Sequence, residues 1–307
     1  MDVLAEARQV TMRFGAFTAV DAADLAITGG EVVGLLGANG AGKTTLIRLL
    51  LGLLEPSDGI VRLFGSAPSA ATRRRVGYVP QTLGLYVDLT VAENWSFTTA
   101  AFGYAGTVLP ETIAAWRGEL VGALPLGAQR QVAFAVALSH RPELLVLDEP
   151  TSGVGPLGAA RLWEQIRQAA DGGAGVLVTT HNMEEAQECD RLVVMADGRV
   201  VARGTTAEII GGRTVAEVRC DDAGRAFALL DAEGFPAQLE GRNGVRVAGP
   251  AAAIAALLAS KGLAAAVDVA GANLEEAFGA IVTDPACPSR RDGPAAAREP
   301  RIPVKPS

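Results

Sequence analysis

The sequence predicts an α/β fold with a mainly parallel sheet, followed by a small α+β domain. Continuous apolar segments occur at residues 31–36, 144–147 and 176–179, and stretches of helical periodicity separate them. Unbroken apolar strands that alternate with helices are typical of a parallel sheet covered on both faces. After about residue 212 the pattern changes to short strands and helices, which indicates a second domain.

The composition agrees with a folded protein and argues against nucleic acid as a partner. Hydrophobic residues make up 49% of the 307 residues, and the formal net charge is −7, whereas binding to nucleic acid normally needs clustered Lys and Arg. The three cysteines are scattered without metal-ligand spacing, which suits a reducing cytoplasm. Residues 1–30 lack the pattern of a signal peptide. The most apolar stretch, residues 249–267, is interrupted by Ser260, Lys261 and Gly262, so we expect no membrane-spanning helix.

The N-terminal region predicts strands, a loop and a helix in that order. Short alternating strands are expected from Val3 to Val10 and from Asp24 to Ile27, and a buried strand from Glu31 to Leu36. A helix from Thr44 to Leu53 follows, and the turn at residues 56–59 ends the region. The glycine-rich segment between the buried strand and the helix is therefore expected to be a loop.

The rest of the chain predicts a helical segment, two further buried strands and the small domain. Helical periodicity dominates residues 90–140. The expected elements after it are strands at Leu144–Leu147, Val176–Thr179, Val215–Arg219 and Gly244–Val247 and helices at Arg225–Glu233 and Ala251–Ser260. The last segment is rich in Pro, Arg and Ala without apolar periodicity, so we expect it to be disordered. The expected parts are a main domain (1–212), a small α+β domain (213–283) and a tail (284–307).

The loop after Leu36 has the sequence and the context of a phosphate-binding loop. It fits the eight-position pattern G-x-x-x-x-G-K-[S/T] completely, with Gly37, Ala38, Asn39, Gly40, Ala41, Gly42, Lys43 and Thr44. Its glycines let successive backbone N–H groups converge on a phosphate, and the start of the helix adds a positive dipole. Lys43 is expected to reach the β- and γ-phosphates and Thr44 to hold Mg²⁺. The alternative is a glycine-rich turn with an incidental lysine.

Two carboxylates end the apolar strand at residues 144–147. Asp148 is expected at the C-terminal edge of the sheet beside the loop, where it can support Mg²⁺. Glu149 comes next and can polarise water, because the water that attacks a phosphoanhydride must lose a proton. An Asp-Glu pair after a strand is otherwise often a helix-capping turn. Together with the loop, the pair predicts that the chain binds ATP and hydrolyses it.

With these motifs in this order, residues 3–212 resemble the nucleotide-binding subunit of an ATP-binding-cassette (ABC) transporter. Residues 77–81 (GYVPQ) resemble the glutamine loop of that family, and residues 179–186 (TTHNMEEA) resemble its histidine switch. The resemblance implies a P-loop NTPase fold, in which a mixed-sheet core carries an antiparallel β subdomain and a helical subdomain. The stretch from Gln81 to Leu124 is shorter than the family usually has, so we expect a shortened helical subdomain.

The resemblance also implies roles for residues outside the loop. Gln81 would sense Mg²⁺ and the membrane partner, and His181 would contact the γ-phosphate. The expected metal residues are therefore Thr44, Gln81 and Asp148. The expected catalytic residues are Gln81, Glu149 and His181. Thr45 extends the nucleotide-binding set. Phe14 stands where the family stacks an aromatic ring on adenine, and its alternative is a core phenylalanine near a strand end. The implied cofactors are ATP and Mg²⁺. His140, beside Arg141 and Pro142, is expected to be a solvated turn residue without chemistry.

Two further segments and the small domain resemble the subgroup that drives drug, antibiotic or polysaccharide export. These segments are residues 85–94 and 272–278. The resemblance implies an ATP-hydrolysing subunit that powers a membrane exporter from the cytoplasmic face of the membrane. Its partners would be a second nucleotide-binding domain, in a homodimer or a heterodimer, and separate integral-membrane permease subunits. The permease subunits would determine which substrate is transported.

Two motifs depart from the family pattern. The signature, usually Leu-Ser-Gly-Gly-Gln, reads Leu124-Pro125-Leu126-Gly127-Ala128 here, and Gly155 replaces an aspartate that normally crosses the dimer interface. The residues that hold the chain's own ATP are complete, while those offered to a partner are altered. One alternative is therefore a weakly hydrolysing partner in an asymmetric heterodimer, and ordinary drift in a working homodimer is equally open. A soluble ABC ATPase that does not transport is the other alternative.

Overall fold

The computed structural model describes residues 2–103, 106 and 108–284. Within them the chain forms two compact units, one that ends at Arg203 and one that begins at Gly204. The division into domains at residue 212 stays a prediction. The expected disordered tail lies outside the described residues, apart from Asp284. No helix among the described residues is both long enough and apolar enough to cross a bilayer.

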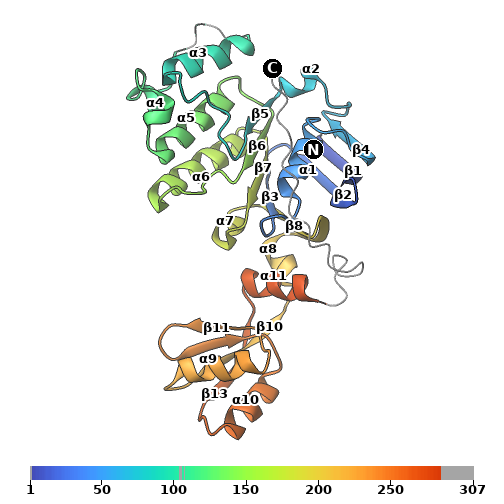
Figure 1. Ribbon diagram of the computed structural model, residues 1–307, viewed down its shortest axis with the longest axis vertical. Helices are drawn as coiled ribbons and strands as arrows, with labels where there is room; N and C mark the ends of the chain where they lie inside the picture. The colour runs from blue at the N-terminus through green and yellow to red at the C-terminus, as the bar shows by residue number, and fades with distance from the viewer. Residues whose placement is uncertain (1, 104–105, 107, 285–307) are drawn as a thin grey trace. The chain divides into compact units, whose positions relative to one another are not determined.

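A six-stranded sheet forms the centre of the first unit (Figure 1). Its strand order is β5 (Val76–Val79), β6 (Leu144–Asp148), β7 (Gly175–Thr180), β3 (Val32–Leu36), β8 (Arg191–Ala196) and β9 (Arg199–Gly204). The first five strands in this order pair in parallel. Every residue of β3, β6 and β7 is buried, which explains why these strands are continuous apolar segments. The three buried strands expected from the sequence are thus confirmed as neighbours in one sheet.

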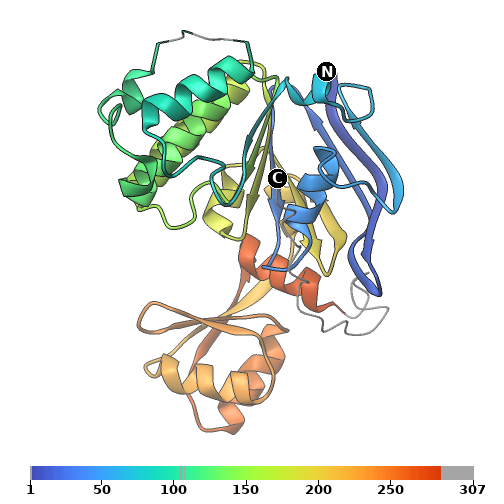
Figure 2. The same ribbon diagram turned by 45° about the horizontal axis from the view of Figure 1, so that its top comes forward.

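A three-stranded antiparallel sheet packs beside this central sheet (Figure 2). Its order is β2 (Phe17–Thr28), β1 (Val3–Phe14) and β4 (Asp58–Leu63). Strands β1 and β2 are longer than the alternation of apolar residues predicts, because several register shifts along their pairing break the period of two. Helix α1 (Lys43–Leu50) lies between the two sheets, and one hydrophobic core joins all three. This helix ends three residues before the expected Leu53, at a turn that contains Gly52 with φ of 64°.

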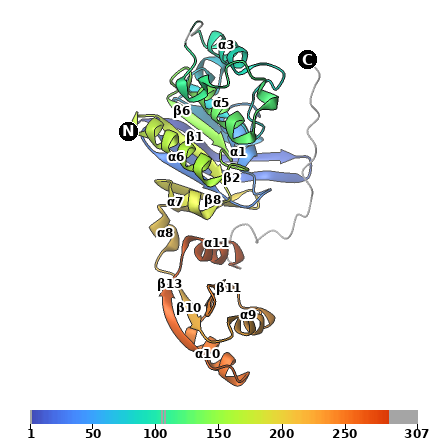
Figure 3. The same cartoon turned by 90° about the vertical axis from the view of Figure 1, so that its left-hand side faces the viewer.

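Helices cover the opposite face of the central sheet. Figures 1 and 3 show α5 and α6 on this side. The helical segment contains α3 (Val91–Ala101), α4 (Glu111–Ala114), the 3-10 helix η1 (Val121–Ala123) and α5 (Leu126–Leu138), and it has a hydrophobic core of its own. Thr90 and Glu93 form a capping box that starts α3. The other helices of this unit are α2 (Ala70–Arg73), α6 (Pro156–Asp171) and α7 (Met183–Gln187).

The expectation that His140 is solvated is wrong. Its side chain is buried, its Nε2 lies 3.1 Å from the carbonyl oxygen of Val76, and its ring stacks on Phe102 at 3.8 Å. Burial lowers the pKa of His140, although its hydrogen bond to the Val76 carbonyl opposes the shift. The sequence could not reveal this, since Phe102 and Val76 come from distant parts of the chain.

The second unit is an antiparallel sheet with helices. Strand β10 (Thr214–Arg219) pairs with β12 (Gly244–Val247) and with β13 (Ala266–Gly271), and β12 also pairs with β11 (Ala237–Glu240). Helices α9 (Ala223–Ala232) and α10 (Ala251–Ser260) share a hydrophobic core with this sheet. The expected strand Gly244–Val247 and helix Ala251–Ser260 are confirmed to the residue. Helices α8 (Thr206–Ile210) and α11 (Leu274–Thr283) complete the unit.

Candidate functional site

The glycine-rich loop leaves the buried strand β3 and enters α1, as the sequence predicts. Gly42 precedes the helix with φ of 96°, a backbone conformation that residues with a side chain rarely adopt. A Cβ on Gly37 would lie only 2.5 Å from the carbonyl oxygen of Met195, so the loop can follow this path only with glycine there. The rim of the loop, from Ala38 to Gly40, is exposed. The loop therefore offers its backbone to a ligand at the end of a rigid strand.

Lys43 is held inside the loop. Its side chain is 5% exposed, and its Nζ donates to the carbonyl oxygens of Gly37 at 2.7 Å and Ala38 at 3.0 Å. Burial lowers the pKa of Lys43, while the negative charges of Glu149 and Asp148 favour its protonated form and oppose the shift. The ammonium group and the two carboxylates thus belong to one electrostatic cluster.

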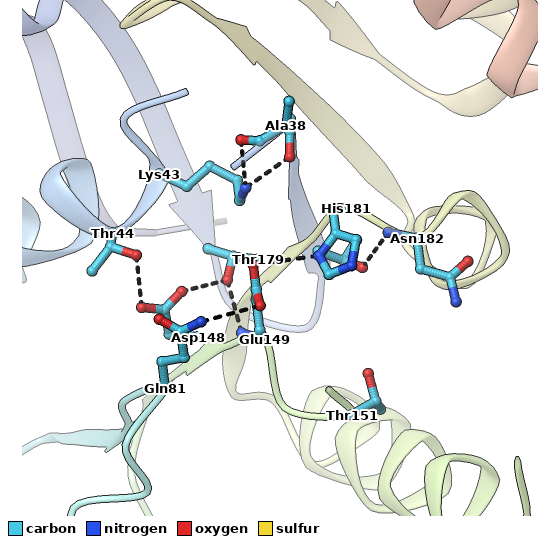
Figure 4. Close-up of polar contacts among 12 residues, drawn as sticks. Ala38, Lys43, Thr44, Gln81, Asp148, Glu149, Thr151, Thr179, His181 and Asn182 are labelled. Carbon is cyan, nitrogen blue, oxygen red and sulfur yellow. Dashed lines mark hydrogen bonds and ion pairs between the residues drawn. The ribbon is translucent and has the colours of Figure 1, made fainter. Parts of the chain in front are cut away.

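Asp148 at the end of β6 connects the loop to the neighbouring strand β7 (Figure 4). Its Oδ2 accepts a hydrogen bond from Thr44 Oγ1 at 3.0 Å, and its Oδ1 accepts one from Thr179 Oγ1 at 2.6 Å. Asp148 and Thr179 are both buried. The parallel order β6, β7, β3 brings the carboxyl ends of these strands to one edge, and this topology places Asp148 beside the loop.

Glu149 is the residue on which the remaining polar groups converge. Its Oε2 lies 3.4 Å from Gln81 Nε2, and its Oε1 lies 3.4 Å from His181 Nδ1. Its backbone N–H donates to Thr179 Oγ1 at 2.9 Å. The side chain of His181 is largely exposed, so this face of the site is open to solvent. Figure 4 shows Gln81, Glu149 and His181 directed toward one another.

A cavity of about 490 Å³ lies beside Glu149 and His181. Thr151, Thr180 and Glu185 line part of it and form a hydrogen-bonded set, in which the hydroxyls of Thr151 and Thr180 both donate to the Glu185 carboxylate. The backbone N–H of Asn182 donates to Thr180 Oγ1 at 2.9 Å. This set connects the loop after β6 to the start of α7, the segment that carries His181.

The structure brings most of the predicted site residues together, and a few lie apart. Lys43, Thr44, Gln81, Asp148, Glu149 and His181 form the cluster described above, while Asn39, Gly40, Ala41 and Thr45 occupy the loop and the first turn of α1. Phe14 is half-buried at the end of β1, where it pairs with Phe17. Its role in adenine stacking stays a prediction.

The altered signature lies at the start of α5. Pro125 is the residue immediately before the helix, and Leu126 and Gly127 are its first two residues. The first N–H groups of an α-helix have no partner within the helix, so these two amides have none within α5. Gly155 precedes α6 in the same way, with no side-chain cap. A Cβ on Gly155 would meet no atom within 4 Å.

Two residues that the sequence analysis left without a role belong to the site. Thr179 bonds both acidic residues, and Arg130 donates to the carbonyl oxygens of Glu149 and Pro150. A polar pair, Thr179 and Thr180, at the end of an otherwise apolar strand was the available signal for the first. No signal in the sequence pointed to Arg130, because its contact depends on how α5 packs against the central sheet.

The residues present fit a Mg²⁺-bound triphosphate. Mg²⁺ is usually held by one or two protein oxygens together with the phosphates, and Thr44 and Asp148 offer two such oxygens 3.0 Å apart. Across residues 2–103, 106 and 108–284, no group of three or more His, Cys, Asp or Glu side chains could hold a metal by itself. The donor set therefore matches a metal shared with a phosphate ligand.

Comparison with known proteins identifies the family of this chain. The ABC transporter family profile matches residues 20–152. The chain is 37% identical over 220 residues to the probable multidrug ABC transporter ATP-binding protein YbhF of Escherichia coli (strain K12), a match that spans 68% of this chain and 38% of that relative. It is 36% identical over 278 residues to the Nod factor export ATP-binding protein I of Burkholderia orbicola (strain AU 1054), which spans 78% of this chain and 90% of that protein.

A solved structure supports the same assignment. The structure of an ATP-binding subunit of an ABC transporter superposes with a TM-score of 0.63 at 30% identity, and the match covers 67% of this chain and 91% of that one. In this chain the phosphate loop, the acidic pair and the histidine lie at the C-terminal ends of β3, β6 and β7. On these grounds the chain belongs to the ATP-binding proteins of the ABC transporter family.

Proposed function

We propose that this chain binds ATP with Mg²⁺, hydrolyses the ATP, and thereby powers a membrane exporter. The observation that carries the proposal is the convergence of Lys43, Thr44, Asp148 and Glu149 at one sheet edge, with Gln81 and His181 each 3.4 Å from the Glu149 carboxylate. A cation, two metal-binding oxygens and a base in one place are the parts that phosphoanhydride hydrolysis needs.

Each residue then has a separate task. The loop amides and the Lys43 ammonium bind the phosphates, and Thr44 and Asp148 hold the metal. Mg²⁺, when bound, neutralises the charge of the phosphate oxygens. Glu149 accepts the proton of the attacking water, and Gln81 and His181 orient that water and the Glu149 carboxylate. The water oxygen bonds to the γ-phosphorus while the bond from this phosphorus to the β–γ bridging oxygen breaks, so ADP leaves with the bridging oxygen and inorganic phosphate is released.

The relatives support export as the process that uses this energy. YbhF carries a multidrug transporter name and the Burkholderia protein a Nod factor export name. We propose that this chain likewise works on the cytoplasmic face of a membrane with separate permease subunits. A second nucleotide-binding domain would complete the site with its signature helix, whose free N–H groups favour a phosphate.

One specific observation favours an asymmetric pair. Pro125 supplies neither a hydroxyl nor an N–H at the start of α5, and Gly155 supplies no carboxylate. These are parts that the chain would offer to its partner, whereas its own phosphate site is complete. In a heterodimer the partner's site would be the weakened one. ATP hydrolysis by the purified chain alone with a Hill coefficient near two would contradict this arrangement.

Nucleotide binding and phosphate release test the main proposal. Calorimetry of the full chain with Mg-ATP should show heat of binding, and Lys43→Ala should weaken the affinity by about 10- to 100-fold through the loss of hydrogen bonds from a charged group. Lys261→Ala is the matched control, because Lys261 pairs with Glu233 in the other unit. Glu149→Gln should bind Mg-ATP but release almost no phosphate. Absence of any binding heat, or an unchanged rate in Glu149→Gln, would refute the proposal.

A further inference from the structure

Arg130 is a buried charged residue that the proposed mechanism does not use. It lies one turn into α5 and is 5% exposed. Its Nη1 donates to the backbone oxygens of Glu149 at 3.0 Å and Pro150 at 3.1 Å, and its Nε has no hydrogen-bond partner. Burial of a guanidinium is costly. The buried position of the Arg130 side chain therefore costs free energy. The group that it contacts there is the backbone of Glu149, the proposed base.

The backbone of Glu149 has an unfavourable conformation. Its φ is 50°, in the left-handed region that residues with a Cβ seldom adopt. Glu149 also precedes Pro150, and a residue before proline is directed toward extended conformations. Two local preferences thus oppose the conformation that the residue has. Such a conformation persists only where the surroundings hold it.

Hydrogen bonds hold the backbone of Glu149 on both sides of its Cα. Its N–H donates to Thr179 Oγ1 on β7, and its carbonyl oxygen accepts from Arg130 on α5. The peptide groups on both sides of its Cα are therefore fixed, and with them the direction of its side chain. That direction leads the carboxylate to Gln81 and His181. Without Arg130, the Glu149 backbone would keep the bond to Thr179 and a 3.2 Å bond from the Ser152 N–H to the same carbonyl oxygen, but it would lose its only hydrogen bond to helix α5 among the described residues.

Helix α5 touches the loop after β6 at a second point. A Cβ on Gly153 would lie 2.7 Å from Leu126 Cδ2, so the first turn of α5 packs closely on this loop. Leu126 is the first residue of α5, and Arg130 is on the following turn. Helix α5 thus contacts the loop after β6 with its first turn and holds the backbone of Glu149 through Arg130. A shift of α5 would be passed directly to the proposed base.

We propose that Arg130 is a positioning residue for ATP hydrolysis, which holds the Glu149 backbone in its left-handed conformation and ties that conformation to the position of α5. The proposal rests on the proposed function, since it requires Glu149 to act as the base. For this role Arg130 does not require a contact of its own with the nucleotide. It acts through the carbonyl groups of Glu149 and Pro150.

Replacement of Arg130 should lower turnover without changing nucleotide affinity. In the full chain, Arg130→Gln should reduce kcat by about tenfold or more, as for other residues that orient a catalytic group, and leave the KM and the Kd for Mg-ATP within about twofold. Arg130→Lys retains a charged hydrogen-bond donor but loses the planar guanidinium group, so its kcat should lie between those of the wild type and Arg130→Gln. Arg161→Gln changes an exposed arginine of α6 and serves as the control. A kcat equal to that of the wild type, or a loss that comes entirely through KM, would overturn the inference.

A double variant distinguishes positioning from general stability. If Arg130 acts through Glu149, then Arg130→Gln should lower the residual rate of Glu149→Gln by less than twofold, because the group that it positions is already gone. A further tenfold loss in the double variant would show that Arg130 acts by another route. If Arg130→Gln does not fold, the comparison of Arg130→Lys with the wild type decides: a lowered kcat at unchanged KM supports the inference, and an unchanged kcat refutes it.

The failure of the inference can be told apart from failure of the proposed function. An unchanged rate of ATP hydrolysis in Glu149→Gln would rule out Glu149 as the base and would refute the proposed function. If the ATPase rate falls strongly in Glu149→Gln but is that of the wild type in Arg130→Gln, the proposed function is supported and only the role of Arg130 is refuted.

Discussion

Thr179 Oγ1 donates a 2.6 Å hydrogen bond to Asp148 Oδ1 and accepts one of 2.9 Å from the backbone N–H of Glu149. A single buried hydroxyl on β7 therefore orients both acidic residues at the end of β6. It bonds the side chain of Asp148, the proposed metal-binding carboxylate, and the backbone of Glu149, the proposed base. The proposed site thus depends on a residue to which the sequence analysis assigned no role.

Thr179→Val tests this dependence. Valine has nearly the same shape but leaves the Glu149 N–H and one carboxylate oxygen of Asp148 without their partner, so the free energy of unfolding should fall by about 1–3 kcal/mol. The rate of ATP hydrolysis should fall by about tenfold, since the loss of roughly 1.4 kcal/mol of positioning corresponds to that factor. Denaturant unfolding and phosphate release measure the two effects. Thr179→Ser keeps the hydroxyl and should stay close to the wild type in both.

The metal pair gives a second prediction. Asp148→Asn removes the charge that Thr44 and Thr179 now bond, and neutral amide oxygen is a poorer ligand for Mg²⁺. The Mg²⁺ concentration that supports half-maximal hydrolysis should rise by about tenfold or more, and EDTA should abolish hydrolysis in the wild type. A Mg²⁺ titration of the ATPase rate measures this. Asp171→Asn, an exposed position at the end of α6, should leave the titration unchanged; an equal shift in both variants would contradict the assignment.

Gly155→Asp restores a carboxylate at the residue that precedes α6. The backbone there is extended and a Cβ meets no atom within 4 Å, so aspartate fits and can cap the helix. The gain in unfolding free energy should be only a few tenths of a kcal/mol, because glycine is itself tolerated at this position. If the missing carboxylate limits the contact across the dimer interface, Gly155→Asp should raise the ATPase rate of the assembled dimer. Gly155→Ala supplies the Cβ without the charge and should not raise it.

His140 gives a prediction for stability against pH. Burial lowers its pKa below the unfolded value of about 6.5, so the unfolded chain takes up a proton first as the pH falls. Its contribution is present in full above about pH 6.5 and is lost as the pH falls toward the lower folded pKa. His140→Phe keeps a ring against Phe102 and removes the titrating group.

The comparison of unfolding free energies at pH 7.5 and pH 5 checks this expectation. The variant should lose less stability between these two values than the wild type does. An equal loss in the wild type and His140→Phe would show that other groups cause the acid sensitivity.

Local rules were sufficient for the phosphate loop and for the buried strands. The loop from Gly37 to Thr44 needs positive φ at Gly42 and close backbone approach at Gly37, and only glycine satisfies both, so the pattern is written in consecutive residues. Strands β3, β6 and β7 are buried on both faces and therefore appear as unbroken apolar segments. Helix ends and strand ends were less predictable, since register shifts in β1 and the turn at Gly52 depend on neighbouring elements.

What the sequence by itself determined is the class of the protein and the chemical groups of its site: the phosphate loop, the acidic pair, Gln81 and His181. What only the tertiary structure decided is how these groups are held. Thr179, Arg130 and the buried His140 each act through a partner more than 15 residues away in the chain. The physical reason is that hydrogen bonds and burial depend on distance in space, and no period or motif in a single sequence encodes which side chain of one element reaches the backbone of another.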